Sequence, residues 1–392
     1  MNNHHTSMIL VVSLILVFLS FGPMEVDGKN DNYSYQPVTH QGKKWRIAYY
    51  QGGNSYAYYP YLAAVVKGLI DLGWIERIEL PIIVDKDPKK LWFWLGQNIK
   101  SPYIEFPIDA FFNANWSNTA RIEVVNTILE RLNKKKDIDL IIAMGTWAGK
   151  DLANNKHNTP TMVMSSTDPK NSGIIESNED SGQDHLFARV DPNRWERQVR
   201  IFYNTIGFKK LGIAYEDSPL GKTYAAIDVI ESLAKEKNFQ IVRCFTKDDI
   251  PDKEQAGQSV VKCFENLAPQ VDAIYVVIQQ GVNSTTIPKL VSIANRYRIP
   301  TFSQQGSDEV KAGLLMSIAR EGGFAPVGRF LAVSMAKILN GAKPRELNQI
   351  FEEAPTIALN LKTAEIIGLY LKAEILAAAD EIYQDITVPT SN

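Results

Sequence analysis

Short apolar runs alternate with amphipathic stretches along this chain from residue 45 almost to its end. WRIAYY (45–50), IDLIIAMG (138–145) and VDAIYVVI (271–278) have the length and composition of buried strands. The stretches between such runs, for example residues 118–135, carry apolar residues at helical spacing. Strands that alternate with helices build parallel sheets with helices on both faces. The sequence therefore predicts an α/β fold.

The strand–helix units are too many for one sheet of ordinary size. A polar, loop-like stretch at 167–183 divides them into two series. We therefore predict two doubly wound lobes with parallel sheets and a ligand cleft between them. The expected lobes are 45–167 plus about 305–345 for the first and 168–304 plus about 346–392 for the second.

Three further elements follow from the same patterns. IELPIIV (78–84) is predicted to be a strand, and DHLFARV (184–190) is predicted to open the second series of strands. Residues 362–384 are predicted to form one long final helix.

The N-terminal segment contains the apolar run Met8 to Gly22, which is too short to span a bilayer comfortably. Small residues suited to cleavage precede residue 29, so we interpret 1–28 as a signal peptide and 29–44 as a flexible leader. Residues 1–7 lack Lys and Arg, which leaves an uncleaved anchor as the alternative. No Cys follows the apolar run, so a lipid-modified N-terminus is not expected. This segment predicts a periplasmic or extracellular protein.

The charge balance and the shortage of reactive residues exclude several functions. The chain has 42 basic and 44 acidic residues, which gives no electrostatic footprint for nucleic acid. The nucleotide and hydrolase motifs GxGxxG, GxSxG and HExxH are absent. After signal removal only His40, His157 and His185 remain, so a metal or Ser–His site is hard to assemble. We expect no enzyme activity, no cofactor and no metal.

The two cysteines, Cys244 and Cys263, lie in a predicted strand and in the helix that follows it. The helical pattern buries Cys263. We interpret the pair as two buried thiols, with a disulfide in an oxidising compartment as the alternative.

Polar side chains follow the predicted strands at the points where the strands end. The carboxyl ends of parallel strands line the ligand sites of such folds. Hydroxyls suit a carboxylate, acidic side chains such as Asp168, Glu216 or Asp217 suit an ammonium group, and Trp147 suits ring stacking. Taken singly, each polar residue has the alternative of capping the next helix. The candidate ligand-binding residues are Gln51, Asn54, Ser55, Thr146, Trp147, Ser165, Ser166, Asp168, Glu216, Asp217, Gln279, Gln280 and Gln304.

Several segments in a characteristic order carry a family resemblance: RIAYYQ, IDLIIAMGTWAGKDL, PTMVMSSTDPKNSGI, KKLGIAYEDS and VDAIYVVIQQGVNST. Through them the chain resembles the substrate-binding proteins of ABC importers, in the group that includes tryptophan- and tyrosine-binding members. The resemblance covers about Lys44 to Ile386 and implies a type I periplasmic-binding fold. It implies a solute receptor for an aromatic amino acid or related aromatic carboxylate, with an ABC permease as partner. It places the ligand residues on the strand-end loops 51–55, 146–147, 165–168, 215–218, 279–280 and 303–305.

Two departures from the family pattern bear on the ligand. Trp147 stands where the family commonly has Pro or another small residue, so the shape of the ligand can differ. Residues 86–117 form an enlarged aromatic segment that is suited to cap the cleft or contact a partner.

Two other functions remain open at this point. A receptor of the same fold can pass ligand occupancy to a signalling partner, and a secreted hydrolase can use Asp168 or Asp217. A cytoplasmic repressor is disfavoured because no helix-turn-helix segment precedes Trp45. We expect the protein to be a monomer.

Overall fold

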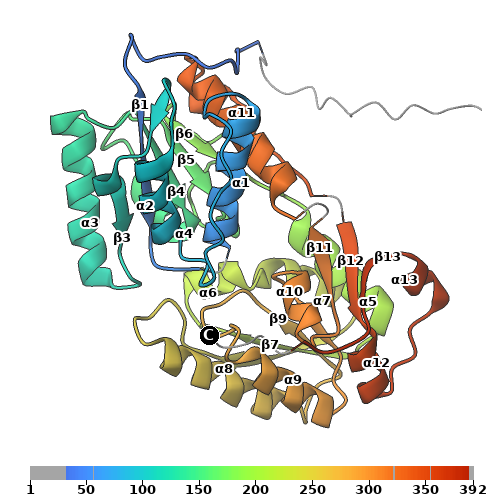
Figure 1. The fold of residues 1–392 in the computed structure, drawn as a ribbon. Helices are drawn as coiled ribbons and strands as arrows, with labels where there is room; N and C mark the ends of the chain where they lie inside the picture. Colours follow the sequence, from blue (N-terminus) through green and yellow to red (C-terminus); the bar gives the residue numbers. More distant parts are fainter. Residues whose placement is uncertain (1–31, 56, 321–322, 354, 388–392) are drawn as a thin grey trace, which may run out of the picture.

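The computed structural model describes residues 32–55, 57–320, 323–353 and 355–387. Two lobes lie one above the other in Figure 1, and each is built on its own sheet. The predicted α/β architecture with two mostly parallel sheets is confirmed. None of the described helices has the length and apolarity required to cross a membrane. The predicted signal peptide lies outside the described residues.

The first lobe is organised around a fully parallel sheet with the order β2-β1-β4-β5-β6, in which β3 also pairs with β1. Its strands are β1 (Trp45–Gln51), β2 (Ile104–Glu105), β3 (Phe111–Asn113), β4 (Leu140–Met144), β5 (Thr161–Met164) and β6 (Leu186–Ala188). Its helices are α1 (Tyr58–Asp71), α2 (Pro88–Asn98), α3 (Asn118–Glu130), α4 (Gly145–Leu152) and α11 (Ala325–Leu339).

Helices α1 and α11 pack side by side although they are far apart in the sequence (Figure 1). Glycines allow this close approach. A Cβ at Gly68 of α1 would lie 2.6 Å from the Cβ of Ala332, and Gly328 of α11 meets Ala64 in the same way. Helix α11 therefore belongs to the first lobe, although it follows the strands of the second lobe up to β11 in the sequence.

The second lobe has a seven-stranded sheet with the order β13-β12-β11-β10-β9-β7-β8, in which only β11 and β12 are antiparallel. Its strands are β7 (Lys210–Tyr215), β8 (Gln240–Phe245), β9 (Ala273–Val276), β10 (Thr301–Ser303), β11 (Met316–Arg320), β12 (Pro355–Asn360) and β13 (Ala379–Tyr383). Its helices are α5 (Arg194–Ile206), α6 (Pro219–Tyr224), α7 (Ile227–Lys237), α8 (Lys253–Leu267), α9 (Ile287–Arg296), α10 (Ser307–Lys311), α12 (Leu361–Ile367) and α13 (Ala373–Ala377).

The lobe boundaries differ from the expected ones. The strand predicted to open the second lobe is β6, which pairs with β5 in the first sheet, so residues 168–188 belong to the first lobe. Residues 307–320 contain α10 and β11 and belong to the second lobe. The chain passes between the lobes after β6 and again near residue 350, where Val190 and Ile350 form a parallel bridge. Strand pairing between distant segments, which local periodicity does not encode, decides these boundaries.

Two predicted elements are wrong. Residues 78–84 form no strand; Pro81 lacks a backbone donor, and Ile82 and Val84 lie exposed on the surface. The predicted final helix is replaced by α12, α13 and β13, because Gly368 adopts a left-handed conformation with φ 70° and ends α12.

The described part of the leader, residues 32–44, is packed against the first lobe rather than flexible. The indole of Trp74 donates to the carbonyl of Tyr35 at 2.9 Å, and the Tyr33 hydroxyl donates to Glu346 at 2.9 Å. These bonds join the leader to two parts of the lobe that are distant in sequence.

The cysteines form a disulfide between Cys244 of β8 and Cys263 of α8, with their Cα atoms 5.5 Å apart. The interpretation as two thiols is therefore wrong and the alternative is confirmed. The physical reason is the packing of α8 on the edge strand β8, which brings the buried Cys263 against Cys244.

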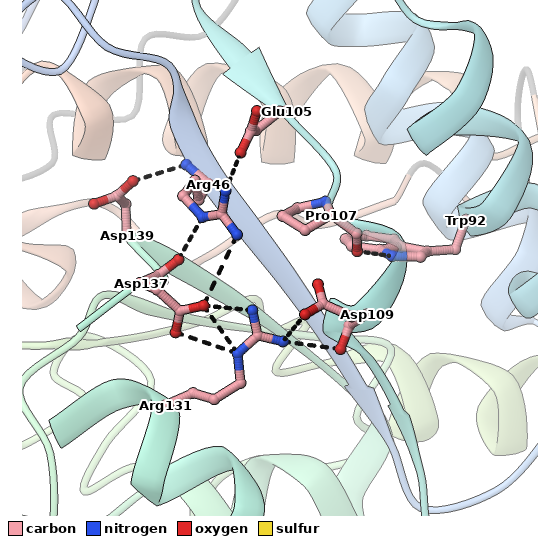
Figure 2. Close-up of polar contacts among 8 residues, drawn as sticks. All are labelled: Arg46, Trp92, Glu105, Pro107, Asp109, Arg131, Asp137 and Asp139. Atoms are coloured by element: carbon pink, nitrogen blue, oxygen red, sulfur yellow. Dashed lines mark hydrogen bonds and ion pairs between the residues drawn. The ribbon is translucent and has the colours of Figure 1, made fainter. Parts of the chain in front are cut away.

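A charge network holds the amino ends of the strands in the first lobe (Figure 2). The backbone N–H of Arg46 donates to Asp139 at 2.7 Å, and its guanidinium donates to the carbonyl of Asp137 at 2.7 Å. The buried Arg131 donates to the Asp137 carboxylate at 2.6 Å and to the carbonyl of Asp109 at 2.8 Å. The network joins the starts of β1 and β4, so the polar residues after these strands lie at the other end of the sheet.

Candidate ligand-binding cleft

A cavity of about 1580 Å³ lies between the two lobes and is lined by both. It is larger than the pocket of an ordinary small ligand, because it joins an inner site at the strand ends to an outer groove along α8 and α9. The first lobe lines the inner part with Asn54, Ser55, Tyr58, Trp116, Thr146, Ser165 and Ser166. The second lobe lines it with Tyr224, Asp248, Asp249, Gln279 and Gln280.

The structure brings seven of the predicted site residues to this lining: Asn54, Ser55, Thr146, Ser165, Ser166, Gln279 and Gln280. The hydroxyls of Thr146 and Ser166 lie 3.1 Å apart and form a hydrogen bond. Ser165 has a left-handed backbone with φ 57°, which is uncommon for a residue other than glycine and is typical of functional sites.

Three predicted residues lie behind the lining and hold it. Gln51 is fully buried, accepts from the Tyr49 hydroxyl at 2.8 Å and donates to the side chain of Asn54. Gln304 accepts from the backbone N–H of Ile278 at 2.6 Å and donates to the carbonyl of Tyr224 at 2.9 Å. Glu216 accepts from the backbone N–H of Asp248 at 3.2 Å.

Asp168 and Asp217 lie away from the lining. Asp168 accepts from the backbone N–H of Asn171 at 2.9 Å and stabilises a local turn. Asp217 is exposed and pairs with Lys222 at 3.0 Å, while its neighbour Ser218 caps α6. Beside Asp217, the structure shows helix capping, which was the alternative to ligand binding. Neither the Asp168 nor the Asp217 carboxylate lines the cleft.

The acidic groups of the cleft are instead Asp248 and Asp249, which the sequence analysis missed. They follow β8 directly, so the strand-end pattern that identified the other residues also applies to them. Asp248 is 4% exposed and accepts from the backbone N–H of Gln280 at 2.7 Å. Asp249 has φ 47° and accepts from the Tyr224 hydroxyl at 3.0 Å.

Burial controls the charge of this acidic pair. Burial raises the pKa of Asp248 to about 6. Burial, and then the charge of Asp248, raise the pKa of Asp249 well above its usual range. Among the described residues, neither carboxylate, nor that of Glu216, has a Lys, Arg or His within ion-pair distance. A cationic ligand group would therefore supply the missing counter-charge.

Aromatic side chains form the wall opposite the acidic pair. Trp116 lines the cleft with φ 56°, and a Cβ at Gly53 would collide with its indole ring. The Tyr58 hydroxyl lies against the backbone of Gly145, where a Cβ would also collide. Burial raises the pKa of Tyr58, so its phenol stays a neutral donor. The two glycines therefore let these aromatic side chains approach the strand ends closely.

Trp147, predicted to be a stacking platform, does not line the cavity. Its ring meets Trp116 edge-on at 5.3 Å, and the guanidinium of Arg121 lies 4.3 Å from its centre. Of these two packed indoles, Trp116 is the one that lines the cavity.

The side of the cleft near the lobe crossings carries Arg189, Arg194 and Trp195. Arg189 pairs with Glu353 at 3.2 Å. The guanidinium of Arg194 stacks over the Trp195 ring at 4.6 Å. Within the described part of the chain, no group of three His, Cys, Asp or Glu side chains is arranged to hold a metal ion.

The family model described as ABC transporter substrate binding protein matches residues 110–383. The chain belongs to this family. Its members bind a small-molecule solute outside the cytoplasmic membrane and work with an ABC permease. The prediction of a substrate-binding protein rather than an enzyme is thereby confirmed at the level of the family.

A curated relative and several solved structures are similar to the chain. The tyrosine-binding protein of Clostridioides difficile (strain R20291) is 25% identical over 179 residues, which are 45% of this chain and 48% of the relative. The chain thus matches about half the length of this relative. An ABC domain from Streptococcus pneumonia in complex with L-Trp is 18% identical and has a TM-score of 0.64. The match covers 87% of this chain and 100% of the chain in that structure.

Two further structures share the fold over 87% of this chain and 100% of their own. A conserved domain protein from Vibrio cholerae is 18% identical with a TM-score of 0.62. A substrate binding protein with adhesive properties from Clostridium difficile, solved in a ligand-free, open form, is 17% identical with a TM-score of 0.58. The predicted periplasmic-binding-protein-like fold is confirmed.

Proposed function

We propose that this protein captures an aromatic amino acid outside the cytoplasmic membrane and delivers it, as a monomer exported by its N-terminal segment, to an ABC permease. The observation that carries the proposal is an acidic pair, with Asp248 buried and Asp249 half-buried, that has no basic partner among the described residues and lies in a cleft with aromatic walls. The ligand contacts both lobes, so its binding energy favours the closed arrangement.

The acidic pair suits the α-ammonium group of an amino acid. Asp248 already accepts a backbone hydrogen bond, whereas Asp249 accepts only the Tyr224 hydroxyl among the described hydrogen bonds. We therefore propose that the ammonium group binds Asp249. The nearby charge of Asp248 adds to the attraction. A charge-assisted bond of this kind is about twice as strong as a neutral one.

The first lobe suits the remaining parts of the ligand. The hydroxyls of Thr146, Ser165 and Ser166 are neutral donors for the carboxylate, and Arg194 lies on the same cavity lining. Trp116 and Tyr58 provide the aromatic wall. Asn54, Ser55, Gln279 and Gln280 complete the proposed contacts, while Gln51, Glu216 and Gln304 position them.

The relatives agree with this ligand class. One is named a tyrosine-binding protein, and one solved structure holds L-Trp. Both ligands combine an aromatic ring with an ammonium and a carboxylate.

Thermal shifts of the ligand-stripped protein with L-Trp, L-Tyr and L-Phe test the proposal. A ligand at 100 times its Kd stabilises the fold by about 2.7 kcal/mol, which is readily detected. N-acetyl-L-tryptophan, which lacks the ammonium, should give no shift. Asp249→Asn should abolish the response, and Asp217→Asn, an exposed acid away from the cleft, should preserve it. If none of the three amino acids shifts the wild-type protein, the proposed ligand class is wrong.

A further inference from the structure

Trp147 is held rigidly by the first lobe. It follows β4 directly, and a Cβ at Gly52 would lie 2.6 Å from its own Cβ, so it packs against the end of β1. Arg121 stacks on its ring, and Asp151 fixes Arg121 through two bonds of 2.8 Å. The Tyr50 hydroxyl donates to the same carboxylate at 2.6 Å. The plane and direction of the indole are therefore set before any ligand arrives.

The indole N–H of Trp147 lacks a partner in this arrangement. The residue is 5% exposed, and Nε1 is buried with no hydrogen bond among the described residues. A buried donor without an acceptor is costly, so its acceptor is expected in another state of the cleft.

The carboxylate of Asp249 in the second lobe lines the cleft and interacts with the Trp147 side chain. The indole is close enough to lower the pKa of Asp249, although the hydrogen bond is not formed. Asp248, Glu216 and Tyr224 of the second lobe and Tyr58 of the first lobe also act on this carboxylate. Of these groups, Trp147 and Tyr224 act on Asp249 as neutral donors. Tyr224 lies in the same lobe as Asp249, whereas Trp147 lies in the first lobe.

We propose that Trp147 is a positioning residue that couples lobe closure to ammonium binding: its indole N–H donates to Asp249 when the lobes close on the ligand. The inference rests on the proposed function, since it needs an ammonium group to hold Asp249 ionised. When the lobes close on the ligand, the indole N–H gains an acceptor and the carboxylate gains a donor. Ligand capture is correspondingly weaker at acid pH, where Asp249 is protonated.

The variant Trp147→Phe tests this role because it keeps a ring against Arg121 and removes only the donor. Titration calorimetry of whichever of L-Trp, L-Tyr and L-Phe binds the wild-type protein gives Kd from pH 5 to 8. We expect Kd to rise about tenfold at pH 7. Because the indole lowers the pKa of Asp249, its loss should also move the acid fall-off in affinity to higher pH. Trp45→Phe, the same change at the far end of β1, should leave both quantities unchanged.

The outcomes separate the two proposals. If the wild-type protein binds an amino acid and Trp147→Phe shows the same Kd and pH profile, the positioning role is wrong and the proposed function stands. If no amino acid binds the wild-type protein, both are wrong. Should Trp147→Phe fail to fold, solvent exchange of the Trp147 indole proton in the ligand-saturated wild-type protein decides. Exchange slower than in the ligand-free protein supports the bond, and equally fast exchange overturns it.

Discussion

The Tyr224 hydroxyl at the end of α6 donates a 3.0 Å hydrogen bond to Asp249, the residue that follows β8 by four positions. The bond joins the end of α6 to the loop after β8 in the second lobe, and burial keeps the phenol a neutral donor by raising its pKa. It thereby fixes one oxygen of the carboxylate that we assign to the ligand ammonium.

Tyr224→Phe should weaken ligand binding about tenfold, because a charged acceptor in a buried site loses a donor. Titration calorimetry with the amino acid that binds the wild-type protein measures the change. Tyr297→Phe alters an exposed tyrosine on the same lobe and serves as the control. An unchanged Kd for Tyr224→Phe would show that the bond does not orient the carboxylate.

Asp248→Asn should stabilise the ligand-free protein more at pH 8 than at pH 5. The folded pKa of Asp248 is raised to about 6, above the unfolded value of about 3.9. Such a group contributes its stability below the unfolded pKa and loses it as pH rises through the folded pKa. Asparagine keeps an oxygen for the Gln280 N–H without the buried charge. Urea unfolding at the two pH values measures the difference, and a loss of stability at pH 8 would contradict the prediction.

His157→Leu should reduce the acid sensitivity of the fold. The rings of His157 and His185 meet edge to face with their centres 4.7 Å apart, and both Nε2 atoms lie near the carbonyl of Leu152. Burial lowers the pKa of His157 to about 4, below its ordinary value, so stability is lost as pH falls from about 6.5 to about 4. The single residue accounts for up to about 3 kcal/mol of this loss.

The measurement for His157 is the wild-type and variant Tm at pH 7 and pH 4.5. The variant should lose less on acidification, while His40→Gln, at a half-buried histidine that contacts Asp139 and lies outside the pair, should behave as the wild type. Equal losses in all three proteins would show that the buried pair does not control acid stability.

Replacing both cysteines by serine should lower the free energy of unfolding by about 3 kcal/mol, the value expected for a disulfide that closes a loop of this length. The disulfide joins residues that are 19 apart in the sequence. Urea denaturation measures the change, and thiol titration of the unreduced native protein should find no free thiol. Two reactive thiols in protein prepared under oxidising conditions would contradict the bond.

Part of the binding site followed from the sequence and part did not. Thr146, Ser166 and Gln279 were found because polar residues after buried strands collect at one edge of a parallel sheet. Asp168 follows such a strand as well, yet a local turn turns it away from the cleft. Asp249 was missed because the residues after β8 were not among the candidates, although Asp249 follows β8 at the same spacing at which Ser55 follows β1.

The alternation of buried and amphipathic segments by itself determined the α/β class, most strands and helices, and the edge at which polar residues gather, because burial periodicity is a local property. Only the tertiary structure decided that β6 completes the first sheet, that Cys244 meets Cys263, and that the Tyr224 hydroxyl donates to Asp249. These relationships join segments whose separation in sequence carries no periodic signal. They arise when helices and strands pack on one another and the two lobes are brought together.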